Sequence, residues 1–266
     1  FILSIQAKML VNLYDTSEFD SFIPNLTEES VVILVSQSGE TGDAIKLIPK
    51  IKFQKSKIIL ISNNPDSTLA KEADIVLDLK AGVNEAIPST KGYIAEITTF
   101  ALVSDAVSGS DSFLQRSGVI INDIDMTLKR DYHQLLELAD RIHTSTDMFV
   151  LGHSVGLSNA YEAALKFKEC SHIETEGYSG LEFRHGPSSV ITADTPVIVL
   201  MADYQSEEDL QQILSEVKDA GAYVIGIGPE NLIHFDYHIE VVEDHWYSPM
   251  TSIVPVQILA FELALV

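Results

Sequence analysis

The residues best suited to chemistry lie in one short polar run, Ser36–Thr41, whose letters are SQSGET. The run directly follows the apolar, β-branched segment Val31–Val35 and precedes a helical pattern. Free N–H groups and the positive end of a helix attract an anion at such a turn, and Ser36, Ser38 and Thr41 add hydroxyl groups. The run lacks the lysine of a nucleotide-binding P-loop and the glycine spacing of a dinucleotide turn. We therefore predict a site for a sugar phosphate or another small monoester, with a solvated Ser/Gly turn as the alternative.

A second polar turn, Pro88–Lys91, precedes the long helical pattern Thr90–Val107. Ser89 or Thr90 can cap the start of that helix. Lys91 places a positive charge in the first turn, where it is electrostatically unfavourable, so a nearby anion would compensate for it. The alternative is a capped helix without a ligand.

Candidate acid–base groups follow in the second half of the chain. Lys166 and Glu169 are three residues apart in the predicted helix Ser158–His172, so their side chains share a face. One carboxylate is enough to move a proton between two adjacent carbons of a sugar, without a redox cofactor or a metal. His185 precedes a Gly-Pro pair that fixes its loop, and an imidazole suits proton transfer to a ring oxygen. The alternatives are a surface ion pair and a structural histidine.

The elements that must position these residues alternate between strands and helices. Short, continuous, β-branched runs predict strands that are buried on both faces of parallel sheets. The alternation predicts an α/β fold in two halves, residues 1–125 and 126–266, joined by the Gly- and Ser-containing segment Ser108–Asp125 and built on about five strands each. The predicted strands are Val31–Val35, Lys57–Ile61, Ile75–Leu77, Met148–Leu151, Val197–Met201, Tyr223–Ile227 and His238–Val241. The predicted helices are Asp43–Lys52, Ser67–Lys71, Thr90–Val107, Leu128–Ile142, Ser158–His172 and Glu207–Ala220, with helical patterns also at Ile2–Leu13 and Ser252–Val266.

Composition narrows the classes of function. With 46% hydrophobic and 21% charged residues, the chain is not disordered throughout. The formal net charge of −22 disfavours binding to nucleic acids and to anionic membranes. The single cysteine, Cys170, cannot form an internal disulfide or a cysteine metal cluster, which favours a reducing, cytoplasmic compartment. The histidines do not pair at the spacing of metal ligands, so no metal is expected.

The motifs together resemble the sugar isomerase (SIS) family. SQSGET and the PSTK of the second turn are similar to two signatures of that family. EAALKFKE at 162–169, followed by EFRHGP at 182–187, resembles the isomerase domain of glutamine–fructose-6-phosphate aminotransferases and stand-alone phosphosugar isomerases and deaminases. The resemblance covers nearly the whole chain. It implies two SIS subdomains, each a mostly parallel sheet with helices on both faces.

The resemblance also implies a function. The chain would be an isomerase or deaminase of a 6-phosphorylated (amino) sugar, such as glucosamine 6-phosphate or fructose 6-phosphate, working as a homodimer with shared active sites and no cofactor. The alternative is a non-catalytic regulatory module that binds sugar phosphates; Glu169 and His185 together favour catalysis, because a sensor needs neither. The family's first strand would precede Phe1, and a lysine-bearing tail would follow Val266. The implied roles are phosphate binding by Ser36, Gln37, Ser38 and Thr41, sugar contact by Ser89, proton transfer by Glu169 with Lys166 one turn earlier, and ring opening by His185 of the neighbouring subunit.

Overall fold

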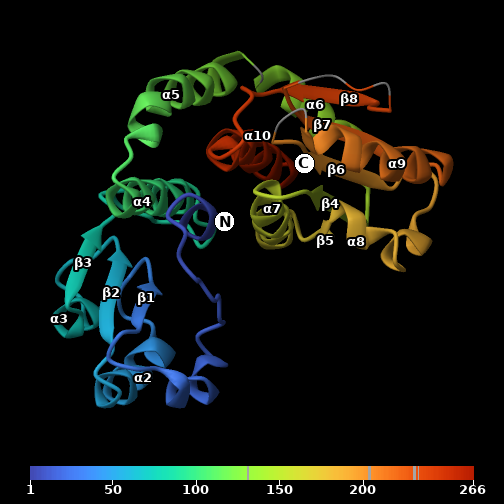
Figure 1. Ribbon diagram of the computed structural model, residues 1–266. Coiled ribbons are helices and arrows are strands. Elements are labelled where there is room, and N and C mark those ends of the chain that lie inside the picture. The colour runs from blue at the N-terminus through green and yellow to red at the C-terminus, as the bar shows by residue number, and fades with distance from the viewer. Residues whose placement is uncertain (131, 203–204, 230–231, 233) are drawn as a thin grey trace. The chain divides into compact units, whose positions relative to one another are not determined.

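The computed structural model describes residues 1–130, 132–202, 205–229, 232 and 234–266 (Figure 1). The described chain forms two compact units, which comprise residues 2–110 and residues 111–266 with residue 1. Each unit contains a parallel sheet, of three strands in the first unit and five in the second. The predicted α/β class with two sheets is confirmed. The expectation of about five strands per sheet is wrong for the described part of the first unit.

The first unit is a three-stranded layer with the order β1-β2-β3. Helices α2 and α3 cover one face, where their apolar side chains meet Val32 and Leu34 of β1 and Ile58 and Leu60 of β2. Helices α1 and α4 pack against each other. The elements are α1 (Ile2–Ile5), 3-10 turns at Phe19–Ser21 and Ile23–Asn25, β1 (Val31–Val35), α2 (Gly42–Phe53), β2 (Lys57–Ser62), α3 (Thr68–Glu72), β3 (Ile75–Asp78) and α4 (Lys91–Ser108).

The helix predicted for Ile2–Leu13 is much shorter than its hydrophobic pattern indicates. It ends at Ile5, and Lys8 adopts a left-handed backbone conformation with φ of 54°. A non-glycine residue in that conformation cannot continue a right-handed helix. Leu10 and Leu13 are almost fully exposed as a result, so the spacing of apolar residues was misleading here.

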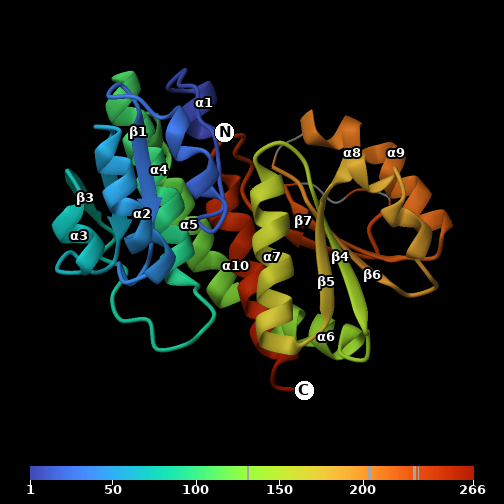
Figure 2. The same ribbon diagram turned by 90° about the horizontal axis from the view of Figure 1, so that it is seen from below.

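The second unit is built on a five-stranded parallel sheet with the order β5-β4-β6-β7-β8. Helices α7 and α10 lie against one face of this sheet, and α8 and α9 lie against the other (Figures 1 and 2). Alternate residues of β4 divide accordingly, since Phe149 and Leu151 pack with Phe183 of α8 and Leu210 of α9. The elements are α5 (Ser112–Arg130), α6 (Tyr132–Ile142), β4 (Asp147–Gly152), α7 (Gly156–Ser171), β5 (Glu174–Ser179), α8 (Gly180–Phe183), a 3-10 turn at Pro187–Val190, β6 (Pro196–Leu200), α9 (Gln205–Asp219), β7 (Tyr223–Gly228), β8 (Tyr237–Glu240) and α10 (Ser248–Leu263).

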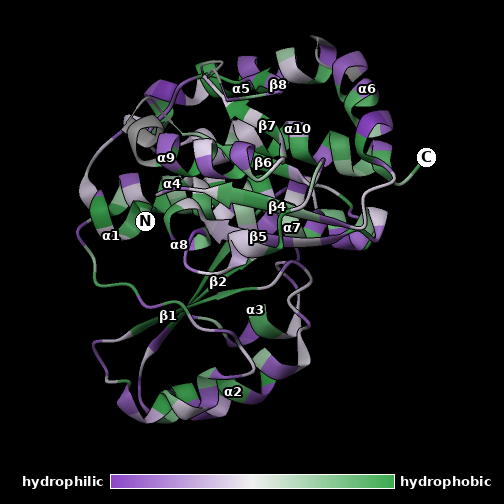
Figure 3. Cartoon of the chain, turned by 90° about the vertical axis from the view of Figure 1, so that its right-hand side faces the viewer, coloured by the Kyte–Doolittle hydropathy of each residue, from purple (hydrophilic) through white to green (hydrophobic). Residues whose placement is uncertain are grey.

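Strand β5 has no counterpart among the strands predicted from the sequence. Its residues are ETEGYS, and Figure 3 shows it in the pale and hydrophilic colours, unlike the hydrophobic β4 beside it. It lies at the edge of the sheet and pairs only with β4 in the described structure. An edge strand has a neighbouring strand on one side only, so its side chains are less completely buried. Such a strand does not need a continuous apolar run.

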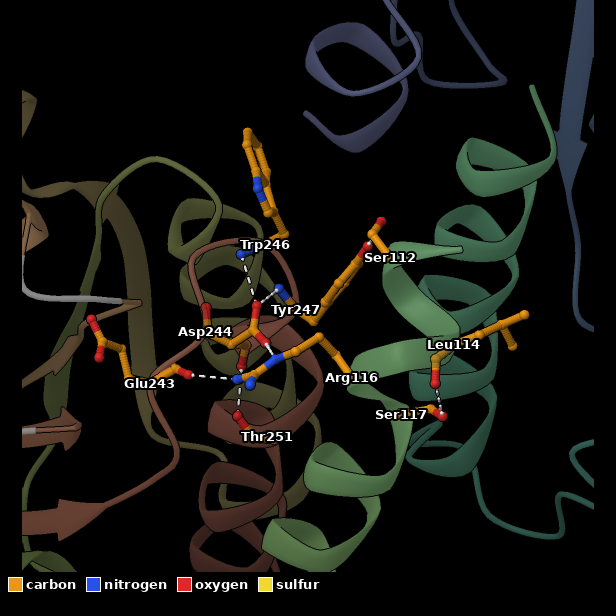
Figure 4. Close-up of polar contacts among 10 residues, drawn as sticks. Ser112, Leu114, Arg116, Ser117, Glu243, Asp244, Trp246, Tyr247 and Thr251 are labelled. Carbon is orange, nitrogen blue, oxygen red and sulfur yellow. Dashed lines mark hydrogen bonds and ion pairs between the residues drawn. The ribbon is translucent and has the colours of Figure 1, made fainter. Parts of the chain in front are cut away.

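The segment Ser108–Asp125, which the sequence predicts as a connection, is mostly helix α5. The start of α5 is fixed to the segment before α10 (Figure 4). Arg116 Nε donates to Asp244 Oδ2 at 2.8 Å, and the Ser112 and Tyr247 hydroxyl oxygens lie 2.9 Å apart. All of α5 therefore belongs to the second unit, and the predicted boundary between residues 125 and 126 falls inside this helix.

The predicted C-terminal helix is confirmed as α10, which is buried along most of its length. Among the residues that the structure describes, no helix is both long enough and apolar enough to cross a membrane.

Candidate active site

The phosphate-loop residues follow β1 and lead into α2, as the sequence predicts. Gly39 has φ of +66°, and a Cβ atom there would lie 2.0 Å from the Ser67 Oγ, so the turn requires glycine at this position. The Ser36 hydroxyl is buried, lies 2.7 Å from the Thr41 hydroxyl and accepts a hydrogen bond from the Gly39 N–H. Ser36, Gly39 and Thr41 of the motif therefore form one compact turn.

The carbonyl groups of this turn face the body of the unit. The Gln37 oxygen accepts from the Asn63 N–H at 3.0 Å, and the Ser38 oxygen accepts from Asn64 Nδ2 at 3.3 Å. Because the N–H of a peptide unit points opposite to its C=O, the Ser38 N–H is directed away from the body. Within the described ranges, the N–H groups of Ser38, Thr41 and Gly42 donate to no other group. Free donors at the start of a helix can bind an anion.

The second polar turn lies beside the first. A Cβ atom at Gly92, near the start of α4, would lie 2.5 Å from Ser89 Oγ and 4.0 Å from Gln37 Cγ. Ser89 and Gln37 therefore border the same glycine, and the structure brings the two motifs together within the first unit. Lys91 does not face this point, because its Nζ donates to the carbonyl of Val83 at 3.2 Å.

A Ser38→Ala substitution tests the phosphate loop directly. The Ser38 side chain is exposed and its Oγ accepts from the Glu40 N–H at 3.2 Å, so removing it leaves no buried group unpaired. We expect the affinity for a sugar phosphate to fall by about 1–3 kcal/mol, the usual loss for a hydrogen bond to a charged group. Isothermal titration with the parent and the variant measures this, and unchanged affinity would remove Ser38 from the site.

The acid–base candidates of the second unit lie on α7. Lys166 Nζ lies 2.6 Å from Glu169 Oε2 and 3.4 Å from Glu162 Oε1. The side chain of Lys166 is only 4% exposed, whereas that of Glu169 is 27% exposed. The alternative of a surface ion pair is therefore excluded. Tyr161 and Leu165 on the same helix are exposed by 57% and 45%.

Two further groups belong to this cluster, and sequence reasoning gave neither of them a role. Burial raises the pKa of Glu162, and the nearby Lys166 charge only partly opposes this effect. Burial also raises the pKa of the Cys170 thiol, so the thiolate is scarce at neutral pH. The four-residue spacing of Glu162 and Lys166 on one helix is the signal that identifies the second carboxylate. Cys170 is a poor nucleophile in this position.

His185 lies on the other side of the five-stranded sheet from α7. Phe183, two residues earlier, is fully buried in the core between the sheet and α9, and Arg184 Nη2 donates to Glu216 of α9 at 2.6 Å. His185 itself is exposed, and none of the described residues forms a hydrogen bond with its imidazole. Glu169 is on α7, which packs on the opposite face of the sheet, so the structure does not bring these two residues together within this unit (Figures 1 and 2).

The described residues contain no group of three or more His, Cys, Asp and Glu side chains arranged to hold a metal ion. The expectation that the site works without a metal or a cofactor stays a prediction. The phosphate loop and Ser89 lie in the first unit, and Lys166, Glu169 and His185 lie in the second.

A family profile described as the SIS domain matches residues 3–104 and 141–266. The chain belongs to the SIS domain family. The resemblance of its motifs to that family is thereby confirmed, and the two matched ranges contain every residue that the sequence analysis placed in the site. Each unit of the structure contains one of the two matched SIS ranges in full.

Relatives of this SIS chain include a glutamine–fructose-6-phosphate aminotransferase (isomerizing) of Oceanobacillus iheyensis, which is 32% identical over 267 residues. The match covers 97% of this chain but only 44% of that protein. A glucosamine-6-phosphate deaminase structure from Thermotoga maritima matches with a TM-score of 0.83 and 25% identity, over 99% of this chain and 79% of the other. The C-terminal domain of a glucosamine-fructose-6-phosphate aminotransferase from Francisella tularensis has a TM-score of 0.89 over 99% of this chain and 78% of its own; at 23% identity it supports the fold alone.

Proposed function

We propose that this chain is an enzyme that isomerises or deaminates a 6-phosphorylated (amino) sugar, beginning with proton transfer between C1 and C2. The observation that carries the proposal is the buried Lys166, whose Nζ holds the Glu169 carboxylate at 2.6 Å. A carboxylate fixed in this way is a general base with a defined position. The named activities of the aminotransferase and deaminase relatives support the same chemistry.

The phosphate of the substrate is proposed to bind in the cradle of Ser36, Gln37, Ser38 and Thr41, with Ser89 contacting the sugar. The free N–H groups of the loop and its hydroxyls supply hydrogen-bond donors there. A net charge of −22 does not prevent this, because the field of distant carboxylates is screened beyond about 8–10 Å. Binding at the loop depends on donors within hydrogen-bonding distance.

The proposed chemistry needs one base that serves two carbons. Glu169 removes the proton from C2 of the open-chain aldose, and the released electron pair forms the C1–C2 double bond of an enediolate. Glu169 then returns the same proton to C1 while the hydroxyl proton of O2 passes to O1, so C2 becomes the carbonyl carbon of the ketose and the reaction gains and loses no atoms. Lys166 restrains the carboxylate between the two steps, since its own burial fixes its position.

Ring opening is proposed to use His185 from a second copy of the chain. Within one chain, Phe183 and Arg184 hold His185 on the α8–α9 face of the sheet, while Glu169 lies on α7 at the other face. The exposed imidazole is available to a neighbouring molecule. A symmetric dimer gives each site one such histidine.

A panel of 6-phosphosugars and their unphosphorylated counterparts tests the proposed function. We expect thermal stabilisation by the phosphorylated sugars alone and turnover of at least one of them. Ammonia released from glucosamine 6-phosphate would select deamination, and interconversion without ammonia would select isomerisation. Binding without any turnover would favour the regulatory module instead.

A further inference from the structure

Glu40 is an unexpected residue in a loop that binds phosphate, because a carboxylate beside an anion repels it. Its side chain is directed to another partner. Glu40 Oε1 accepts a hydrogen bond of 2.7 Å from the backbone N–H of Thr68, the first residue of α3. This hydrogen bond is the main cause of the lowered pKa of Glu40. The carboxylate is thus charged and engaged with α3.

The neighbouring backbone is held by the same segment. The Gly39 carbonyl oxygen accepts from the Leu69 N–H at 3.1 Å, and Gly39 lies close against the Ser67 side chain. Ser67 is itself fixed as the N-cap of α3, where its Oγ accepts from the Ala70 N–H at 3.3 Å. Residues 67–69 therefore contact the backbone of Gly39 and the side chain of Glu40, the two residues that precede Thr41.

The Gly39–Glu40 segment leads directly into Thr41 and Gly42, whose N–H groups are proposed to bind the phosphate. Thr41 is the N-cap of α2, and its side chain makes no capping hydrogen bond to that helix. The Thr41 hydroxyl lies 2.7 Å from that of Ser36, and the Thr41 carbonyl accepts from the Ile45 N–H. On the N-terminal side, the direction of the Thr41 and Gly42 N–H groups depends on the Gly39–Glu40 backbone that leads into them. Fixing that segment to α3 fixes the direction of the donors.

We propose that Glu40 is a positioning residue of the phosphate site. It does not contact the phosphate; it holds the backbone of Gly39–Thr41 against the start of α3, so that the N–H groups of Thr41 and Gly42 stay directed at the ligand. The proposal rests on the proposed function, since it assumes that the loop binds phosphate.

Two substitutions separate positioning from charge. Glu40→Asp keeps the negative charge but is one methylene too short for the bond to Thr68, whereas Glu40→Gln removes the charge and keeps an acceptor oxygen at the same reach. If the carboxylate acted only through its charge, Glu40→Asp would bind phosphate like the parent and Glu40→Gln would bind it more tightly. Positioning instead predicts that Glu40→Asp binds phosphate more weakly than the parent and that Glu40→Gln binds it like the parent. Glu72→Gln is the matched control, because Glu72 lies on the same helix and pairs with Lys52, away from the loop.

The measurement is calorimetric titration of the full chain with inorganic phosphate and with glucosamine 6-phosphate. We expect Glu40→Asp to weaken both affinities by about tenfold, and Glu40→Gln and Glu72→Gln to stay within about threefold of the parent. Amide hydrogen exchange at residues 39–43 should accelerate in Glu40→Asp alone, while the thermal unfolding midpoints of all variants stay close to that of the parent.

Parent-like phosphate affinity in Glu40→Asp, or tighter binding in Glu40→Gln, would overturn the positioning role and leave the phosphate site standing. A parent that binds neither ligand would overturn the site itself, and with it both proposals. A parent that binds inorganic phosphate but turns over no sugar would contradict the proposed function only, and the comparison of the Glu40 variants would still decide their role.

Discussion

A Glu169→Gln variant should bind phosphosugars as the parent does, while its turnover falls by at least about a hundredfold, the lower end for loss of a general base. The amide of glutamine keeps the shape of the side chain but cannot accept the proton from C2. Lys166 remains next to Glu162, at 3.4 Å, so its buried ammonium keeps one partner and the variant should fold. Steady-state kinetics and titration calorimetry on the same preparation separate the two effects.

Glu174→Gln is the control for this experiment. Glu174 follows α7 closely in the chain, is 72% exposed and pairs with Lys168 at 2.9 Å, so the substitution removes the same charge from a surface pair. Exposed pairs of this kind contribute little to stability, and we expect activity within about twofold of the parent. Full activity in Glu169→Gln would place the base elsewhere. Equal losses in both variants would show that charge alone, and not position, sets the rate.

The sequence predicts those parts of the fold that depend on continuous apolar runs. All seven predicted strands agree with observed strands to within one residue at each end. Their apolar runs, such as Val31–Val35 and Tyr223–Gly228, stand out in the sequence. Strand β5 does not, because it is a polar edge strand. Helix α5 was hidden by its Gly, Ser and Asp residues; its buried side is carried by residues seven apart, Phe113, Ile120 and Thr127.

The candidate site also contains parts that the sequence predicts and parts that only the tertiary structure reveals. The phosphate loop is contiguous, so its residue types and their order are sufficient to predict it. The burial of Lys166 is not predictable from α7 alone, since Tyr161 and Leu165 on that helix are exposed while the lysine is buried. The bond between Glu40 and Thr68 joins residues from two turns, and only the tertiary structure places them together. Hydrophobic patterning does not predict the burial or the contacts of charged residues such as these.

A shared active site predicts that two inactive chains restore activity when they are mixed. Glu169→Gln removes the proposed base, and His185→Ala removes the proposed ring-opening group. In a dimer that exchanges histidines, a mixed pair contains one site with both substitutions and one site with neither. Random exchange at equal concentrations makes about half of the dimers mixed, and each has one intact site of two, so about a quarter of the parent activity should return.

The folding of His185→Ala is not at risk, because His185 is exposed and Phe183 and Arg184 hold the segment independently of it. Subunit exchange is verified with chains that carry different mass labels, and each variant is assayed alone as the background. Recovered activity would require that His185 acts on the other copy. Confirmed exchange without recovery would mean that His185 serves its own chain or has a structural role, and the dimeric site would then be wrong.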